Sequence, residues 1–148
     1  MTILNNDICL NLGDREIKVI ETPGHTPGGV SFIDKTYGLL FTGDLLYEGP
    51  LYAFENESNP EIYLNSLKEI AKLPIKTIHP GHNHPNNNNY PNLLNEATNL
   101  FERVIKDDRY DKKSDELQDV VEYLHPNYNA ESGKGRKLRV LVKLSHSN

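Results

Sequence analysis

The alternation of apolar and polar residues predicts strands over the first third of the chain. Residues 8–12 and 16–20 each alternate weakly, and the Gly13-Asp14 pair between them is a strong hairpin signal. Two further apolar runs, 30–33 and 39–42, are separated by a short polar segment that is typical of a longer hairpin loop. We therefore expect four strands that form an antiparallel meander.

Helical periodicity follows this meander. One helix is expected between the N-cap residue Asn59 and Pro74, with its apolar positions on the face that packs against a sheet. Residues 93–105 carry the clearest helical stripe of the chain. A third helix is expected to begin at Ser114 and to end at Pro126.

Two short strands complete the pattern. Residues 75–79 form a short apolar run before a Pro-Gly pair, and residues 138–144 alternate so that one face is polar. Strands that are mixed with helices in this order predict an α+β fold with an antiparallel or mixed sheet.

Composition narrows the class of protein. A chain of 148 residues is long enough for one domain, and its net charge of −5 argues against a nucleic-acid partner. No apolar run approaches the ~20 residues that cross a bilayer, and residues 1–7 lack the pattern of a secretory signal. The single cysteine, Cys9, excludes an internal disulfide and a thiolate metal cage. We expect a soluble, cytoplasmic protein without a membrane partner.

Three segments share one arrangement, in which a strand runs into a glycine and a metal-ligand side chain follows. They are Thr-Pro-Gly-His with His25, Phe-Thr-Gly-Asp with Asp44, and His-Pro-Gly-His with His82. Glycine permits a sharp turn, which places the next side chain at the rim of a sheet. Each residue alone is more often structural, but two imidazoles and a carboxylate together favour zinc or another divalent cation.

These motifs resemble those of the metallo-β-lactamase-fold hydrolases, in order, spacing and flanking strands, from about residue 7 to about residue 106. The resemblance implies half of an αββα sandwich with helices on the outer face of its sheet. It also implies that His25 is a ligand of a first metal, that His82 completes a second site, and that Asp44 bridges both metals and is catalytic.

The resemblance further implies an activity and a cofactor. Members of this family use a metal-bound hydroxide to attack small-molecule esters, thioesters or lactones, with zinc, iron or manganese as the metal. Residues 45–54, rich in aromatic and apolar groups, favour the thioesterase, lactonase and glyoxalase-II-like branch. Tyr47 and Tyr52 are candidate hydrogen-bond donors to a developing oxyanion, with ordinary loop packing as the alternative.

One family motif is missing. The family's His-x-His-x-Asp-His sequence lies upstream of the position that matches His25, and no histidine occurs among the 24 residues before His25. We therefore expect residues 1–148 to form a single, partial domain, the C-terminal half of the fold, with one weakly held cation or none. The alternatives are a non-catalytic interaction module and a site completed by another chain. An uncovered sheet face predicts a homo-oligomer or a partner chain.

Overall fold

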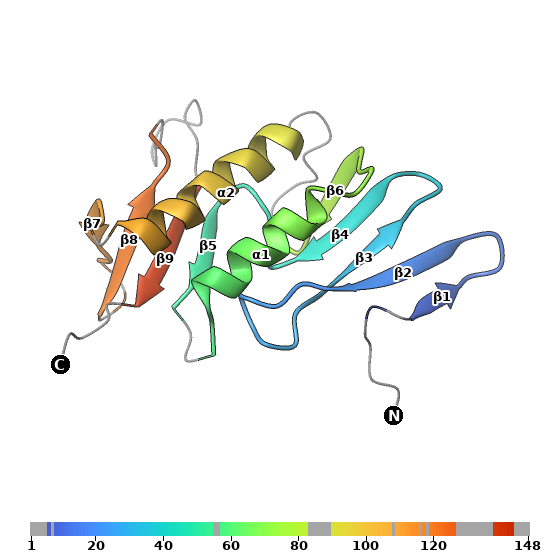
Figure 1. The fold of residues 1–148 in the computed structure, drawn as a ribbon, viewed down its shortest axis with the longest axis horizontal. Helices are drawn as coiled ribbons and strands as arrows, with labels where there is room; N and C mark the ends of the chain where they lie inside the picture. The colour runs from blue at the N-terminus through green and yellow to red at the C-terminus, as the bar shows by residue number, and fades with distance from the viewer. Residues whose placement is uncertain are drawn as a thin grey trace.

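The fold was obtained as a computed structural model (Figure 1). It describes residues 6, 8–54, 57–82, 90–107, 109–115, 117, 119–126 and 138–143. Within these residues, strands form two sheets and two helices pack on them. The expected α+β class, with mixed sheets, is confirmed.

The first sheet contains the predicted meander. Its strands are β1 (Cys9–Asn11), β2 (Glu16–Glu21), β3 (Val30–Asp34), β4 (Leu39–Gly43) and β6 (Thr77–Pro80). The first four pair antiparallel in sequence order, whereas β6 pairs parallel with β4. Because β4 and β6 run the same way, their carboxyl ends lie at the same edge of the sheet.

The second sheet has the strand order β5-β9-β8-β7. Its strands are β5 (Pro50–Ala53), β7 (Lys112–Lys113), β8 (Val120–Leu124) and β9 (Arg139–Lys143). Strand β5 pairs parallel with β9, and β8 pairs antiparallel with both of its neighbours. The strand expected near the C-terminus is thus present, while β5 lies in a segment that we expected to be a loop.

The prediction of a helix from Ser114 to Pro126 is wrong, because Ser114 directly follows β7 and Val120–Leu124 form strand β8. The Ser114 hydroxyl does accept a hydrogen bond from the Leu117 N–H at 3.2 Å, as a helix cap does. Asp119 then adopts a positive φ of 58°, and Val120 and Val121 begin a strand that is buried on both faces. A short, doubly buried apolar run fits a strand as well as a helix, so its periodicity is ambiguous.

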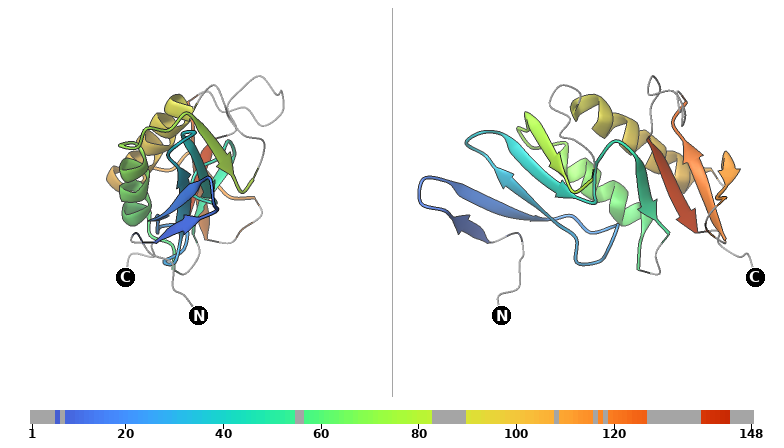
Figure 2. Two further views of the ribbon diagram at one scale, coloured as in Figure 1. Left: turned by 90° about the vertical axis from the view of Figure 1, so that its right-hand side faces the viewer. Right: turned by 180° about the vertical axis from the view of Figure 1, so that it is seen from behind.

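Both other helices form as expected, as α1 (Pro60–Ile70) and α2 (Tyr90–Lys106). The Asn59 side chain caps α1 by accepting hydrogen bonds from the N–H groups of Glu61 and Ile62, each at 3.0 Å. The helices lie side by side on one face of the sheets (Figure 2), and the Tyr63 ring of α1 stacks on the Phe101 ring of α2. The expected placement of the helices on one face is confirmed.

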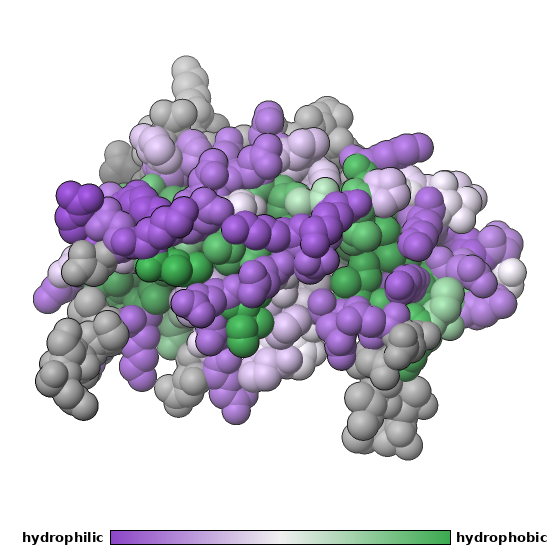
Figure 3. Space-filling model, viewed as in Figure 1, coloured by the Kyte–Doolittle hydropathy of each residue, from purple (hydrophilic) through white to green (hydrophobic). Residues whose placement is uncertain are grey.

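The surface of the helix-bearing side is mostly hydrophilic, with apolar side chains visible between the purple ridges (Figure 3). The core lies beneath the helices and includes the fully buried Ile33, Leu40 and Ile78 of the first sheet. No helix among the described residues has the length and apolarity that a bilayer crossing requires. Packing of this apolar layer holds the two helices against the strands of the first sheet.

Candidate functional site

The three candidate side chains come from three turns at one edge of the first sheet. His25 lies in the loop between β2 and β3, Asp44 directly follows β4, and His82 follows β6 by two residues. The Gly81 N–H donates to the Gly43 carbonyl at 2.8 Å and ties the last two turns together. The parallel pairing of β4 with β6 therefore brings Asp44 and His82 to the same place.

Two glycines permit this convergence. Gly24 has φ of +138°, and a Cβ there would lie 2.3 Å from the Tyr63 Cα, so the His25 loop rests directly on α1. A Cβ at Gly81 would lie 3.1 Å from the Asp44 Oδ1. Both turns thus approach a neighbour more closely than a side chain allows.

The structure brings His25, Asp44 and His82 together. The His25 Nε2 lies 3.7 Å from the Asp44 Oδ2, and the His82 Nε2 lies 3.0 Å from the Asp44 Oδ1. The three side chains are 25%, 46% and 59% exposed, in that order along the chain, so the group is open to solvent. Each imidazole meets a different oxygen of one carboxylate.

The tautomer of His25 is set by the backbone. Its Nδ1 lies 2.9 Å from the Tyr52 carbonyl oxygen, which only accepts, so Nδ1 carries the hydrogen and donates. In the neutral ring Nε2 then presents a lone pair toward Asp44. Two acceptors that face each other repel, and a cation between them would relieve that repulsion.

The donor set fits a divalent cation in its chemistry. Ligand atoms on a tetrahedral zinc ion with bonds of ~2.0–2.2 Å lie roughly 3.3–3.6 Å apart. The two N–O distances, 3.0 and 3.7 Å, fall on either side of that range. Among the described residues, however, no group of three or more His, Cys, Asp or Glu side chains has the arrangement of a formed metal site. The role of His25, Asp44 and His82 as ligands stays a prediction.

Two buried tyrosines support the site. The Tyr63 hydroxyl lies 2.9 Å from the Asp44 carbonyl and 2.7 Å from the Leu45 carbonyl, and it donates to this pair. The Tyr47 ring packs on the His82 ring at 5.1 Å, while its hydroxyl donates to the Pro50 carbonyl. Burial raises the pKa of both hydroxyls well above the usual value, so both stay neutral donors.

Sequence reasoning missed the part played by Tyr63, whose apolar neighbours made it look like core alone. For Tyr47, the structure commits the hydroxyl to the backbone of Pro50, and the contact of Tyr52 with His25 is made by its carbonyl. A backbone partner of this kind leaves no signal in the sequence.

The remaining histidines lie elsewhere or outside the described residues. The His79 ring stacks on the Phe41 ring at 5.1 Å, and the His125 Nε2 lies 3.8 Å from a carboxylate oxygen of Glu96. His84 and His146 fall outside the described residues. Neither His79 nor His125 contacts Asp44 in these interactions, so both can serve as controls when metal binding to His25 and His82 is measured.

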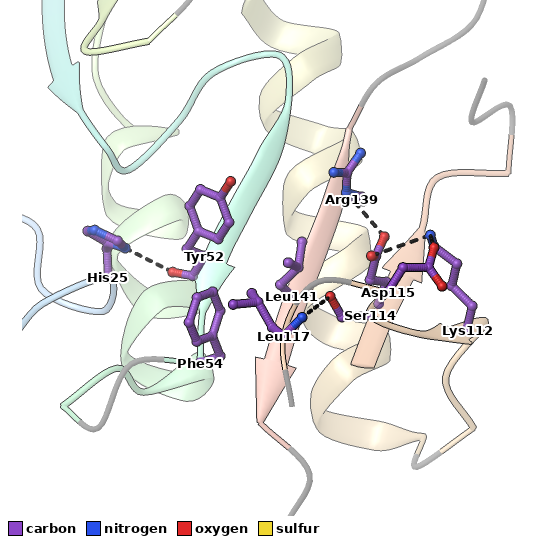
Figure 4. Close-up of a pocket in the computed structure, with 10 residues that line it drawn as sticks. His25, Tyr52, Phe54, Lys112, Ser114, Asp115, Leu117, Arg139 and Leu141 are labelled. Atoms are coloured by element: carbon purple, nitrogen blue, oxygen red, sulfur yellow. Dashed lines mark hydrogen bonds and ion pairs between the residues drawn. The ribbon is translucent and has the colours of Figure 1, made fainter. Parts of the chain in front are cut away.

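Two hollows adjoin His25. One, of about 210 Å³, is lined by Thr22, Thr26 and Asp44 among others. The second, of about 410 Å³, lies between Tyr52 and Phe54 on one side and Leu117 on the other (Figure 4). His25 lines both hollows, so a molecule in either one would lie beside the candidate site.

Comparison of the sequence with known proteins identifies the family of this chain. The sequence profile of the metallo-beta-lactamase superfamily matches residues 3–82, a stretch that contains all three candidate residues. The chain belongs to the metallo-beta-lactamase superfamily.

Two characterised relatives share that stretch in part. The hydroxyacylglutathione hydrolase of Chelativorans sp. (strain BNC1) is 36% identical over 109 residues, which are 70% of this chain and 41% of that protein. The human acyl-coenzyme A thioesterase MBLAC2 is 32% identical over 84 residues, which are 54% of this chain and 30% of that protein. The chain thus matches less than half the length of either relative.

Solved structures of the same fold resemble the chain. A metallo-beta-lactamase from Staphylococcus aureus subsp. aureus COL gives a TM-score of 0.56 at 25% identity, over 74% of this chain and 39% of that one. A metallo-beta-lactamase family protein from Thermus thermophilus gives 0.58 at 23% identity, over 67% and 34% of the two chains. The second likeness concerns the fold alone.

Proposed function

We propose that this chain is a metal-dependent hydrolase that cleaves a thioester. The observation that carries the proposal is the meeting of His25 and His82 with the two oxygens of Asp44 at one sheet edge. The relatives named for hydrolysis of hydroxyacylglutathione and acyl-coenzyme A, both thioesters, support this class of substrate over the ester and lactone that the sequence also allows.

His25, Asp44 and His82 are the residues that would hold the cation, with zinc as the first choice and iron or manganese as alternatives. Such a cation, when bound, polarises the substrate oxygen and lowers the pKa of water. Asp44 supplies the negative charge and is the proposed catalytic residue. Tyr52 orients His25 through its carbonyl, and Tyr47 fixes the ring of His82.

The test compares two isosteric substitutions. Asp44→Asn removes the charge and one metal-binding oxygen, whereas Asp14→Asn makes the same change in the exposed turn between β1 and β2. With zinc present, we expect Asp44→Asn to lower thioester turnover by at least ~100-fold, and Asp14→Asn to leave it unchanged. Turnover is followed by release of free thiol from an acylated glutathione and from an acyl-coenzyme A.

Two results would contradict the proposal. The assignment of Asp44 is wrong if the Asp44→Asn variant keeps wild-type turnover. The non-catalytic alternative holds if the wild-type chain, incubated with zinc, iron or manganese, hydrolyses neither thioesters nor esters nor lactones above the rate without protein.

We also propose that a second copy of the chain, or a partner chain, covers the helix-free face of the first sheet. The strand registers place Val19, Phe32, Phe41 and His79 in one row across β2, β3, β4 and β6. Phe41 in this row is 39% exposed, although it is a large apolar side chain. Val19 in the same row is fully buried, so Phe41 is the exposed apolar side chain in this row that a partner would cover.

A further inference from the structure

The larger hollow beside His25 lies on the helix-free face of the second sheet. The strand registers place Tyr52, Leu141, Glu122 and Lys112 directly opposite one another, in one row across β5, β9, β8 and β7. Opposite residues in a sheet share a face, so this row forms the floor of the cavity of about 410 Å³. The turn that contains Ser114 and Leu117 covers it from one side (Figure 4).

One part of this cavity is apolar. The Tyr52 and Phe54 rings pack edge to face at 5.6 Å, and they lie across the cavity from Leu117 (Figure 4). Leu141 is buried, with 4% exposure, and is also one of the residues that line the cavity. Its side chain thus contributes to the apolar wall of the cavity.

The other part is a chain of compensated charges. The Glu122 side chain is 5% exposed, with the Arg139 Nε at 3.2 Å and the Lys112 Nζ at 3.5 Å. The Lys112 Nζ also lies 3.3 Å from the Asp115 Oδ2. Two acids and two bases balance, so a charged ligand would break an existing pair at a large cost, whereas an uncharged polar group would not.

The cavity is large enough for a hydrocarbon chain of about eight carbons. If each methylene takes about the volume of a water molecule, ~30 Å³, an eight-carbon chain takes ~240 Å³. That is well below the cavity volume of about 410 Å³. The cavity also falls in the size range of pockets for small molecules, ~300–1,000 Å³.

The position of the cavity connects it to the candidate site. His25 lines the cavity, and its Nε2 lies 3.7 Å from Asp44. Most of the other lining residues, from Lys112 to Leu141, lie beyond residue 82, where the family profile ends. The candidate ligands thus lie inside the stretch matched by the family profile, and most of the cavity lining lies after it.

We propose that this cavity binds the acyl group of the substrate and selects uncharged chains, of which an eight-carbon chain fits within its volume. That the ligand is an acyl group rests on the proposed hydrolase function. That the cavity binds an uncharged chain is independent of that function. Tyr52, Phe54, Leu117 and Leu141 contact the hydrocarbon, and the Glu122 cluster excludes a charged end.

The test uses three probes of equal length: octanamide, octanoate and octylammonium. Binding to the full chain is measured by calorimetry at pH 7.5 in the presence of EDTA, so that no carboxylate–metal bond contributes. We expect octanamide to bind at least 10-fold more tightly than either charged probe. Because no hydrolysis is involved, this result is independent of whether the chain turns over a thioester.

Cavity-filling variants locate the binding. Leu141→Trp, and Leu117→Trp in the covering turn in case the first variant does not fold, should each weaken octanamide binding by at least 10-fold. Leu12→Trp makes the same change at a side chain that is 62% exposed and should leave binding unchanged. The proposal is overturned if octanoate or octylammonium binds as tightly as octanamide, if octanamide does not bind at millimolar concentration, or if folded cavity variants bind it like wild type.

Discussion

Tyr47 is the side chain that packs against His82, one of the proposed metal ligands. Its ring packs on the His82 ring at 5.1 Å, and its hydroxyl is tied to the Pro50 carbonyl. The His82 side chain is 59% exposed, and its Nε2 lies 3.0 Å from the Asp44 Oδ1. Packing by Tyr47 therefore limits the rotamers from which His82 can reach Asp44.

Substitution of Tyr47 separates packing from hydrogen bonding. We expect Tyr47→Ala to weaken zinc affinity by ~10-fold or more, because His82 loses its neighbour. Tyr47→Phe keeps the ring and should change the affinity by less than ~3-fold. Competition with a chromophoric chelator measures both. Equal affinities for wild type and Tyr47→Ala would show that the ring does not position His82.

For single residues, the sequence singled out three side chains that lie close together, but not the groups that hold them in place. His25, Asp44 and His82 could be singled out because a glycine before a ligand side chain is a local pattern. The Tyr52 carbonyl that orients His25 could not, since 27 positions separate the two residues and the contact depends on where β5 lies. The same reason hid the contact of Tyr63 with the backbone of Asp44.

The loop before β3 and helix α1 form one unit at the scale of elements. The Gly24 carbonyl accepts a hydrogen bond from the N–H of Asn59, the residue that caps α1, at 3.0 Å. The Ser66 hydroxyl of α1 donates to the Pro23 carbonyl at 2.6 Å. The position of His25 is therefore fixed by the helix on which its loop rests.

A pair of glycine variants tests this coupling. Gly24→Ala forces a Cβ to within 2.3 Å of the Tyr63 backbone at φ of +138°, so we expect the free energy of unfolding to fall by at least about 2 kcal/mol. Gly28→Ala, in the same loop with no atom within 4 Å of the new Cβ, should change it by less than about 0.5 kcal/mol. Urea denaturation measures both, and similar values for the two variants would contradict the close approach.

Helices and hairpins whose ends are marked by capping, proline or turn residues could be predicted from the sequence. Strands that depend on pairing with a distant part of the chain could not. The α1 helix has its cap and its proline in the sequence, and the hairpins have their turn residues. Strand β5 depends on β9, which lies 89 positions away in the register Pro50–Arg139. Strand β8 reads as a helix because its apolar residues face both sides of a sheet.

For the whole molecule, the uneven covering of the first sheet is the main consequence of the fold. The two helices bury one face, while the row of Val19, Phe32, Phe41 and His79 lies on the other. The exposed Phe41 side chain in this row is the observation that supports the proposed second polypeptide on the helix-free face.

Sedimentation velocity tests this proposal. We expect the wild-type chain to sediment as a dimer at micromolar concentration, and Phe41→Glu to shift it toward the monomer by placing a charge in the apolar row. Ile62→Glu makes a similar change at a residue of α1 that is 43% exposed, and it should leave the dimer intact. A wild-type monomer that binds no apolar dye would show that this face needs no cover.

The most direct test of the shared cation is a nuclear magnetic resonance titration of the imidazole nitrogens with zinc. Saturation should move the Nε2 signals of His25 and His82 together, at one zinc ion per chain, and leave His79 in its stack with Phe41 unchanged. Asp44→Asn should abolish or weaken both shifts. Zinc that moves neither signal, or that moves only one of them, would contradict the convergence of these three residues on a common ion.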